Sequence, residues 1–474
     1  MHAVNDSPSN RLQVLPPTSD LLQHSGVRPL IAEQGRDVVM GWIRDALADV
    51  RRGLLAGETH GDRRKLTDTV AERVAHRAER ARRNKFGRLI NATGVILHTG
   101  LGRAPLSKAS QTAVAELAGA GNVEIDLETG ERRHRGYQLN SAWHTLSGAE
   151  DSLVVNNNAA ATLLTLQALC QGKEVIISRG QLIEIGGSFR LPEIFKLSGA
   201  RLREVGTTNR TKLSDYEQGI GPETAAIMHV HPSNYRVIGF TEEPRIDELA
   251  RVAHAHALIT IDDIGSGSLI DLTKYGLPAE PTFSESVALG ADVVLGSGDK
   301  LLGGPQCGII LGKSEFVQRI RRHPLARAVR IGKLTLAALS ETLGSYLRSE
   351  AESEIPTIAM LAVQGGTLLK RARAIEEKIG ETQQLAIQVS EATAPVGGGS
   401  LPGAEMPTAV LSLQHQAVSS DELARSLRLG RIRVFCRIQQ DKVLVDLRSV
   451  QSEDDSRIVL ALRLIDGQEN IDLV

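Results

Sequence analysis

A single lysine stands within a run of glycines in the segment VLGSGDKLLGGPQCGIIL, residues 294–311. Lys300 follows a hydrophobic stretch typical of a buried strand, and it is flanked by Gly296, Gly298, Gly303 and Gly304. Glycines permit tight backbone turns, so we expect the amine to be held at a fixed place beside a crevice. Burial disfavours the charged form and lowers the pKa of such an amine, which makes it a nucleophile able to form a Schiff base.

Two further polar signals fall where predicted strands end. Asp263 follows the strand-like segment ALITID, and the segment VVNNNAAATLL runs from a strand directly into a helix. The first backbone N–H groups of that helix, near Asn157, Asn158 and Ala159, form an anion site, to which the two asparagines add side-chain donors. Together these features predict a pocket for pyridoxal 5'-phosphate. The helix start would bind its phosphate, the Asp263 carboxylate its pyridine nitrogen, and Lys300 its aldehyde.

Other phosphate-binding motifs fit these segments less well. The segment GSGDK lacks the G-x-x-x-x-G-K-[ST] spacing of a P-loop, and the segment GSGS lacks the third glycine of a dinucleotide-binding turn. The order along the chain, with a phosphate loop first, then the aspartate and then the lysine, is that of the large α/β class of pyridoxal phosphate enzymes related to aminotransferases. The pattern therefore favours pyridoxal phosphate chemistry over nucleotide binding.

The elements that must position these residues alternate along the chain. Short apolar runs that read as strands are DSLVVNN, KEVIISR, ARLREVG, TAAIMHVH, ALITIDD and ADVVLGS, and amphipathic helical patterns separate several of them. Such alternation predicts a mainly parallel sheet covered by helices on both faces. Active sites in such folds gather at the carboxyl ends of the strands, where the lysine and the aspartate stand.

Composition limits the remaining possibilities. Lys and Arg total 55 against 56 for Asp and Glu, yet the stretch from Arg51 to Arg88 holds twelve basic and five acidic residues. This local surplus is a candidate surface for RNA phosphates or an ordinary solvated helix. The three cysteines are widely spaced without a C-x-x-C pair, which argues against a disulfide framework or a zinc site, and the N-terminal segment has no apolar h-region. We expect a cytoplasmic protein without a metal or a membrane span.

Eight motifs of the chain, in the same order, resemble those of bacterial selenocysteine synthases, the L-seryl-tRNA(Sec) selenium transferases. They are RLINATGVILHTGLGRAPLS, VVNNNAAATLL, EIGGSFRLPEI, EVGTTNRT, HPSNYRVIGFT, DIGSGSL, SGDKLLGGPQCG and HPLARAVRIGKLTLAAL. The resemblance implies an aminotransferase-like (fold type I) α/β enzyme. Its parts would be a helical tRNA-recognition domain at 1–65, a basic helical linker at 66–88, a large cofactor-binding domain at 89–335, and a linking helix with a small α+β domain at 336–474.

The resemblance also implies roles for individual residues. Lys300 would be the catalytic lysine that binds the cofactor, with Asp299 assisting it. Asp263 would contact the pyridine nitrogen, Ser297 the phosphate, and His231 would lie near the cofactor or simply pack at a strand end. Arg103, with Arg327 and Arg330, would bind the selenium donor, and the three-residue spacing of the last two predicts one helix face.

The chemistry implied is replacement of the seryl hydroxyl on seryl-tRNA(Sec). A dehydroalanyl-tRNA forms, and selenium from selenophosphate then adds to give selenocysteinyl-tRNA(Sec). The resemblance further implies a homo-oligomer built from dimers, for which a decamer is one candidate size.

Two departures from the family pattern stand out. Gly100 occupies a position where the family has asparagine, and the segment 431–438 replaces a proline-containing pattern. Two alternative functions stay open at this point: a lyase acting on a small amino acid or amino-sugar phosphate, and a catalytically silent RNA-binding protein on the same fold. The helical N-terminal region argues against the lyase, because a small substrate needs no tRNA-recognition domain. The presence of both Lys300 and Asp263 argues against the silent protein.

Overall fold

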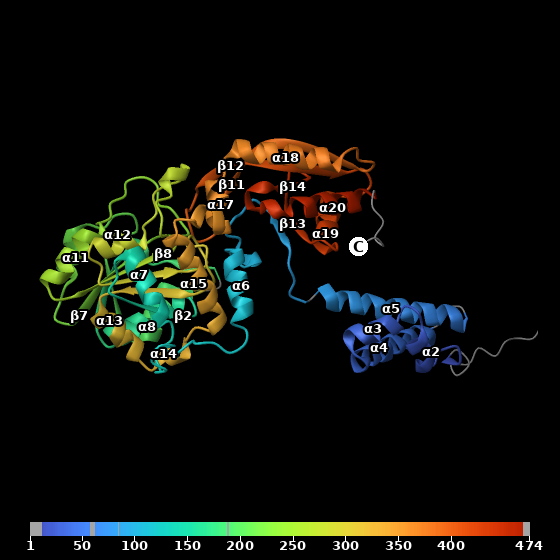
Figure 1. Ribbon diagram of the computed structural model, residues 1–474, viewed down its shortest axis with the longest axis horizontal. Helices are drawn as coiled ribbons and strands as arrows, with labels where there is room; N and C mark the ends of the chain where they lie inside the picture. Colours follow the sequence, from blue (N-terminus) through green and yellow to red (C-terminus); the bar gives the residue numbers. More distant parts are fainter. Residues whose placement is uncertain (1–11, 57–61, 84, 187–188, 468–474) are drawn as a thin grey trace, which may run out of the picture. The chain divides into compact units, whose positions relative to one another are not determined.

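The computed structural model describes residues 12–56, 62–83, 85–186 and 189–467 of the chain. It divides into two compact units, residues 1–88 and residues 89–474 (Figure 1).

The first unit is helical. Its elements are α2 (Thr18–Gln23), α3 (Arg28–Gln34), α4 (Arg36–Leu55) and α5 (Arg63–Arg83). Gly35, at φ 89°, separates α3 from α4, a conformation that glycine adopts without strain. Apolar side chains at helical spacing on α4 and α5, among them Val39, Ile43, Leu66 and Val70, form one buried core.

This core changes the domain boundaries expected from sequence. Residues 66–88 were expected to be a linker, but α5 contributes Leu66, Val70 and Val74, each completely buried, to the same core as α4. An expected boundary at residue 65 would therefore cut through a packed element, and the structure places the division between the units after Arg88.

A seven-stranded sheet forms the larger part of the second unit. Its strand order is β2-β10-β9-β8-β7-β3-β6. The bounds are β2 (Asp151–Val155), β3 (Glu174–Ser178), β6 (Arg201–Val205), β7 (Thr224–Val230), β8 (Ile259–Gly265), β9 (Val293–Ser297) and β10 (Gly308–Gly312). All neighbours pair in parallel except β10, which is antiparallel to both β2 and β9. The expected mainly parallel sheet is confirmed, with β10 as an additional strand.

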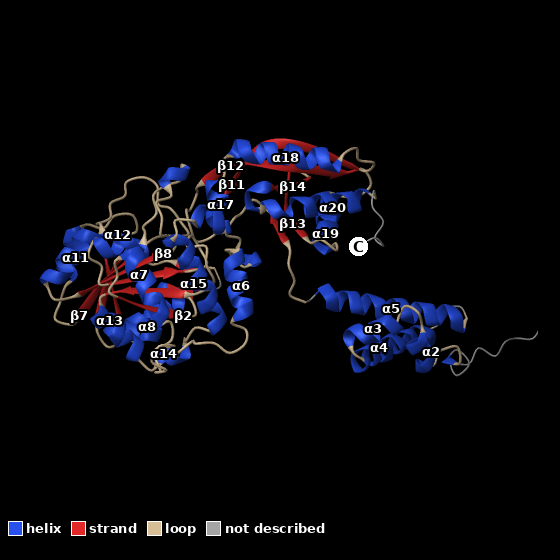
Figure 2. Ribbon diagram, viewed as in Figure 1, coloured by secondary structure: helices blue, strands red, loops and turns tan. Residues whose placement is uncertain are grey.

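Helices surround this sheet (Figure 2). They are α6 (Lys108–Glu116), α7 (Asn140–Ser147), α8 (Asn158–Cys170), α9 (Leu191–Ser198), α10 (Leu213–Gly219), α11 (Ile246–Ala255), α12 (Phe283–Ala288), α13 (Ser314–Arg322), α14 (Leu325–Ala328) and α15 (Lys333–Leu347). A two-stranded ribbon, β4 (Glu184–Ile185) with β5 (Phe189–Arg190), lies outside the main sheet. None of the described helices is both long and apolar enough to span a membrane.

A second sheet of order β1-β13-β14-β12-β11 gathers the C-terminal strands. Its strands are β1 (Ile90–Ala92), β11 (Leu385–Pro395), β12 (Glu405–His415), β13 (Val434–Gln439) and β14 (Lys442–Asp446). The accompanying helices are α16 (Ala351–Glu354), α17 (Pro356–Ala362), α18 (Gly365–Ile379), α19 (Ser420–Leu429) and α20 (Asp455–Asp466). Strand β1 was expected in the domain 89–335, but it pairs in parallel with β13, so that range does not coincide with the sheet that residues 90–92 join.

Candidate active site

A cavity of about 400 Å³ opens where strands β7, β8 and β9 end. Nine of the residues expected at the site line it: Arg103, Asn157, Asn158, Ala159, His231, Asp263, Ser297, Asp299 and Lys300. The carboxyl ends of parallel strands lie at one edge of a sheet, which is why these residues converge although they are far apart in sequence.

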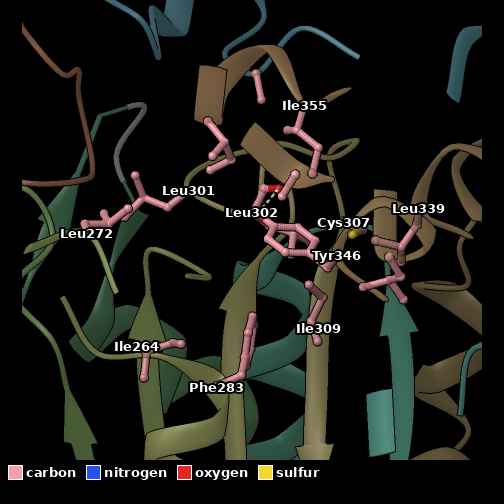
Figure 3. Close-up of a cluster of buried hydrophobic side chains, with 14 of the residues drawn as sticks. Ile264, Leu272, Phe283, Leu301, Leu302, Cys307, Ile309, Leu339, Tyr346 and Ile355 are labelled. Atoms are coloured by element: carbon pink, nitrogen blue, oxygen red, sulfur yellow. Dashed lines mark hydrogen bonds between the residues drawn. The ribbon is translucent and has the colours of Figure 1, made fainter. Parts of the chain in front are cut away.

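Lys300 is held in a turn that leaves β9. The Leu301 backbone N–H donates to Ser266 O at 3.0 Å, and the side chains of Leu301 and Leu302 are completely buried in the core (Figure 3). Tyr346 closes this cluster, since its hydroxyl donates to Leu302 O at 2.9 Å. The turn is therefore fixed by packing on the side away from the cavity, and the side chains of Asp299 and Lys300 line the cavity on the other side.

The Lys300 side chain itself is 4% exposed. Burial, together with the positive charge of Arg103, lowers the pKa of its amine to about 8, against the opposing charges of Asp263, Asp299 and Glu280. Near pH 8 about half of such amines are neutral, and only the neutral form is nucleophilic. The expected reactive lysine thus has a physical cause in the structure.

Both oxygens of the Asp263 carboxylate accept hydrogen bonds. Its Oδ1 accepts from Asn158 Nδ2 at 2.8 Å and from the Gly265 N–H at 3.1 Å, and its Oδ2 accepts from Thr162 Oγ1 at 3.0 Å. Burial raises the pKa of this group, while these bonds and the charge of Lys300 counteract the rise. A buried carboxylate at the floor of the cavity is suited to pair with a protonated ring nitrogen.

Helix α8 begins at the cavity wall. Asn157 caps the helix, because its Oδ1 accepts from the Ala160 N–H at 2.9 Å. The two asparagine side chains were expected to add donors for an anion. Instead Asn158 donates its amide to Asp263, and its buried Oδ1 has no hydrogen-bond partner among the described residues. The Asn158 amide is therefore engaged within the site, while the backbone N–H groups at the start of α8 lie at the place where the sequence predicts an anion.

Asp299 connects three elements of the site. Its Oδ1 accepts from Ser297 Oγ and its Oδ2 from Arg103 Nη1, each at 2.9 Å. Arg103 holds a left-handed backbone conformation, φ 59°, in the turn after Gly102, which is rare for a residue with a side chain. The strained turn and the carboxylate together direct the guanidinium toward the cavity.

His231 follows β7 and is paired with a carboxylate that sequence reasoning missed. Its Nε2 lies 3.2 Å from Glu280 Oε2, without the alignment of a hydrogen bond. The Glu280 side chain is only 4% exposed and comes from the loop before α12, a segment with no motif. No signal in the single sequence could have assigned it to the site.

Arg327 and Arg330 do not line the cavity. The prediction that both lie on one helix face is wrong, because α14 ends at Ala328 and Arg330 forms an isolated bridge with Val155. The Arg330 guanidinium lies 3.5 Å from Glu124. Arg330 thus lies at the end of β2, and neither arginine lines the cavity that contains Lys300 within this chain.

A glycine-rich segment between β11 and β12 was also missed. The run VGGGS, residues 396–400, looks like a break between domains, yet Gly399 lies against Lys300: a Cβ at this glycine would be 3.1 Å from Lys300 Cε. The missed signal was the run of three glycines itself, which suits a close backbone approach as well as a linker.

The two departures from the family pattern meet in the fold. A side chain at Gly100 would begin 3.3 Å from the His98 ring, and that ring makes an edge-to-face contact with Phe435 at a centroid distance of 5.9 Å. Phe435 belongs to β13, within the altered segment 431–438. One local environment therefore contains both changes, and Gly100 itself does not line the cavity.

Comparison with known proteins gives consistent matches over nearly the whole chain. The family model for L-seryl-tRNA selenium transferase matches residues 89–451. The L-seryl-tRNA(Sec) selenium transferase of Alkaliphilus metalliredigens is 43% identical over 462 residues, 96% of this chain and 98% of the relative. That of Aquifex aeolicus is 45% identical over 413 residues, 87% and 90% of the two chains.

Among solved structures, D-glucosaminate-6-phosphate ammonia-lyase is similar with a TM-score of 0.55 and 21% identity, over 81% of this chain and 96% of that one. At this identity the likeness concerns the fold, which is the aminotransferase-like fold type I expected from the sequence.

Proposed function

Because the chain belongs to the L-seryl-tRNA selenium transferase family, we propose that it converts seryl-tRNA(Sec) to selenocysteinyl-tRNA(Sec) with pyridoxal 5'-phosphate as cofactor. The reaction passes through a dehydroalanyl-tRNA and takes its selenium from selenophosphate. The observation that carries the proposal is the buried amine of Lys300 in one cavity with the buried carboxylate of Asp263. Pyridoxal 5'-phosphate needs an amine for its aldehyde and a carboxylate for its ring nitrogen, and these two residues supply them.

The residues of the cavity fit pyridoxal 5'-phosphate. The start of α8 and the hydroxyl of Ser297 can hold the phosphate, and Asp263 can hold the ring nitrogen. The buried Oδ1 of Asn158, a residue that lines the cavity, has no hydrogen-bond partner among the described residues and is an available acceptor. When bound, the cofactor supplies an electron sink for the electrons released at the substrate Cα. Lys300 would hold its aldehyde.

Lys300 is also placed to move the Cα proton. Its depressed pKa, about 8, lets Nζ accept a proton near neutral pH and return it later. Asp299, fixed by Ser297 and Arg103, orients groups beside that amine. Lys300 is therefore proposed to carry the proton, and Asp299 to keep its surroundings in place.

Arg103 is proposed as the main contact of this chain for the donor anion. A guanidinium offers forked donors that match a phosphate-like oxyanion. Arg327 and Arg330 remain proposed donor-binding residues, although they lie outside the cavity of a single chain. We therefore propose a homo-oligomer built from dimers, in which these arginines complete the site of a neighbouring subunit.

The first unit is proposed to recognise tRNA(Sec). The relative from Alkaliphilus metalliredigens aligns with 96% of this chain, so the alignment includes most of the helical unit as well as the catalytic one. Exposed cations of α5, such as Lys65 and Arg80, stand on the face opposite its buried stripe. These side chains are suited to bind RNA phosphates. We also propose a cytoplasmic location, because seryl-tRNA is available there.

The test compares three amino donors on the full-length protein. We expect the visible spectrum of the protein with bound pyridoxal 5'-phosphate to change with seryl-tRNA(Sec), and to stay unchanged with seryl-tRNA(Ser) or free serine. Adding selenophosphate should then yield selenocysteinyl-tRNA(Sec), and Lys300→Ala should abolish the product. A spectrum that responds only to a small amino compound would favour a lyase instead.

A further inference from the structure

The loop between β11 and β12 reaches the catalytic lysine. At Gly399, φ 87°, a Cβ would lie 3.1 Å from Lys300 Cε and 3.2 Å from Nζ. Distances in this range are tighter than nine in ten real Cβ contacts, so a methyl group there would displace the end of the lysine side chain. The space left by the absent side chain is therefore the space next to the reactive amine.

The loop cannot easily retreat from this contact. The Leu97 N–H donates to Val396 O at 3.0 Å, and Leu97 also bridges Gly397, where an added Cβ would meet the Leu97 backbone oxygen at 2.9 Å. Val396 is completely buried, and so is Ser400. Both flanks of Gly399 are thus fixed by packing and by a backbone hydrogen bond.

The backbone of the lysine is fixed as well. The Gly304 N–H donates to Gly298 O at 2.9 Å, and the side chains of Leu301 and Leu302 are buried in the core of Figure 3. When two backbones are held, an added methyl between them moves the flexible side chain. We propose that Gly399 is a positioning residue, which leaves room for the Lys300 amine and holds it facing the cavity.

The consequence concerns the covalent step and rests on the proposed function. Nζ of Lys300 forms a bond to the aldehyde carbon of pyridoxal 5'-phosphate, and the aldehyde oxygen leaves as water with two protons from the amine. The substrate amine would later bond to the same carbon, the bond from Nζ would break, and two protons would pass from the substrate amine to Nζ. The freed lysine amine then needs a place beside the cavity. The space at Gly399 provides it, so both directions of the exchange depend on this glycine.

The experiment measures the rate of that condensation in the full-length protein stripped of cofactor. Pyridoxal 5'-phosphate is added to wild type and to Gly399→Ala, the visible band is followed with time, and borohydride trapping identifies Lys300 as the modified residue. We expect Gly399→Ala to condense on the order of tenfold more slowly, because small misplacements of a reacting group cost rate steeply.

Two glycines of the same loop supply matched controls. Gly403, φ 73°, has no heavy atom within 4 Å of an added Cβ, so Gly403→Ala introduces the backbone strain alone. Gly398→Ala would place a methyl at an ordinary 3.6 Å from Thr99 Cγ2. Both should condense at the wild-type rate. Equal slowing in Gly403→Ala and Gly399→Ala, or no slowing in Gly399→Ala, would overturn the proposal.

A second measurement tests the role of Gly399 independently of whether pyridoxal 5'-phosphate is the cofactor. Labelling of Lys300 by acetic anhydride needs no cofactor, and it should be altered severalfold in Gly399→Ala but not in Gly403→Ala. Wild-type protein that never condenses with pyridoxal 5'-phosphate would contradict the cofactor. The labelling comparison would still decide the role of Gly399.

Discussion

The guanidinium of Arg103 lies 2.9 Å from the carboxylate of Asp299, the residue directly before the buried Lys300. Arg103 is the proposed contact for the selenium donor, and its positive charge also lowers the pKa of the Lys300 amine. The ion pair therefore links the proposed donor site to the reactive amine. A cation shared between a carboxylate and an arriving anion needs donors held in a fixed fork, which a guanidinium has and the freely rotating ammonium of a lysine lacks.

Arg103→Lys should therefore weaken use of the donor. We expect the KM for selenophosphate to rise about tenfold, while the KM for seryl-tRNA(Sec) changes little, since a lysine can serve Asp299 or the anion but not both in the forked geometry. Steady-state kinetics with each substrate varied in turn would measure this. Arg201→Lys, an exposed ion pair with Glu223, is the matched control. An equal rise in both KM values would contradict the assignment.

Lys300 should be recognisable by the pH dependence of its reactivity. Its pKa of about 8 is below the ordinary value, so the amine becomes neutral and reactive as the pH rises through 8. Labelling of the cofactor-free protein with acetic anhydride, followed by mass spectrometry, should give a midpoint near pH 8 for Lys300. Exposed lysines in the same digest are the reference. A midpoint near pH 10 would show that burial does not depress this pKa.

Asp263→Asn removes a negative charge that raises the Lys300 pKa. The labelling midpoint should therefore move below pH 8. Turnover should fall at least about a hundredfold, because the proposed ring nitrogen loses its anionic partner. Single-turnover assays measure the second effect. Unchanged turnover in a folded Asp263→Asn protein would remove this residue from the proposed site.

Charge reversal on α5 should weaken binding of tRNA(Sec). Lys65→Glu and Arg80→Glu are expected to reduce affinity several-fold each and to lower the salt dependence of binding by about one unit per lost phosphate contact. Filter binding at several salt concentrations would measure both. Arg251→Glu, an exposed site on α11, is the control. A salt response that stays nearly flat in wild type would contradict an electrostatic role for the helix.

Leu66→Ala tests whether α5 is part of the helical core. Leu66 is completely buried, so the truncation should cost about 2–5 kcal/mol, whereas Leu55→Ala at a half-exposed position should cost little. Hydrogen exchange of the full-length protein, read on peptides of α4, would report the loss. Exchange in peptides of β8 and β9 should not change. Unaltered protection of α4 would mean that residues 66–83 behave as a linker.

The residues that converge at the strand ends could be predicted because their signals are local. Each of Asp263, Ser297 and Lys300 follows an apolar run, and the parallel sheet brings such ends together without any knowledge of tertiary contacts. Strand β10 was overlooked, because its short run GIIL follows directly on the glycine-rich motif and reads as part of it.

Other parts of the site depend on contacts between distant segments, which periodicity does not report. Gly399 comes from a hairpin of the other sheet and Glu280 from an irregular loop, so neither has a pattern that points to Lys300. Arg330 was misplaced for a different reason: helical spacing from Arg327 predicts a shared face only if the helix continues, and α14 ends first.

Strand β1 has a consequence for how the protein is made. Ile90 lies only two residues after Arg88, the last residue of the first unit. Its partner Val434 lies near the end of the second unit and is synthesised much later. The helical unit and all seven strands of the larger sheet are therefore synthesised before β13, the partner of β1 in the smaller sheet. Contacts this distant in sequence form slowly, so β1 remains an uncovered strand during synthesis and closure of the smaller sheet is a late event of folding.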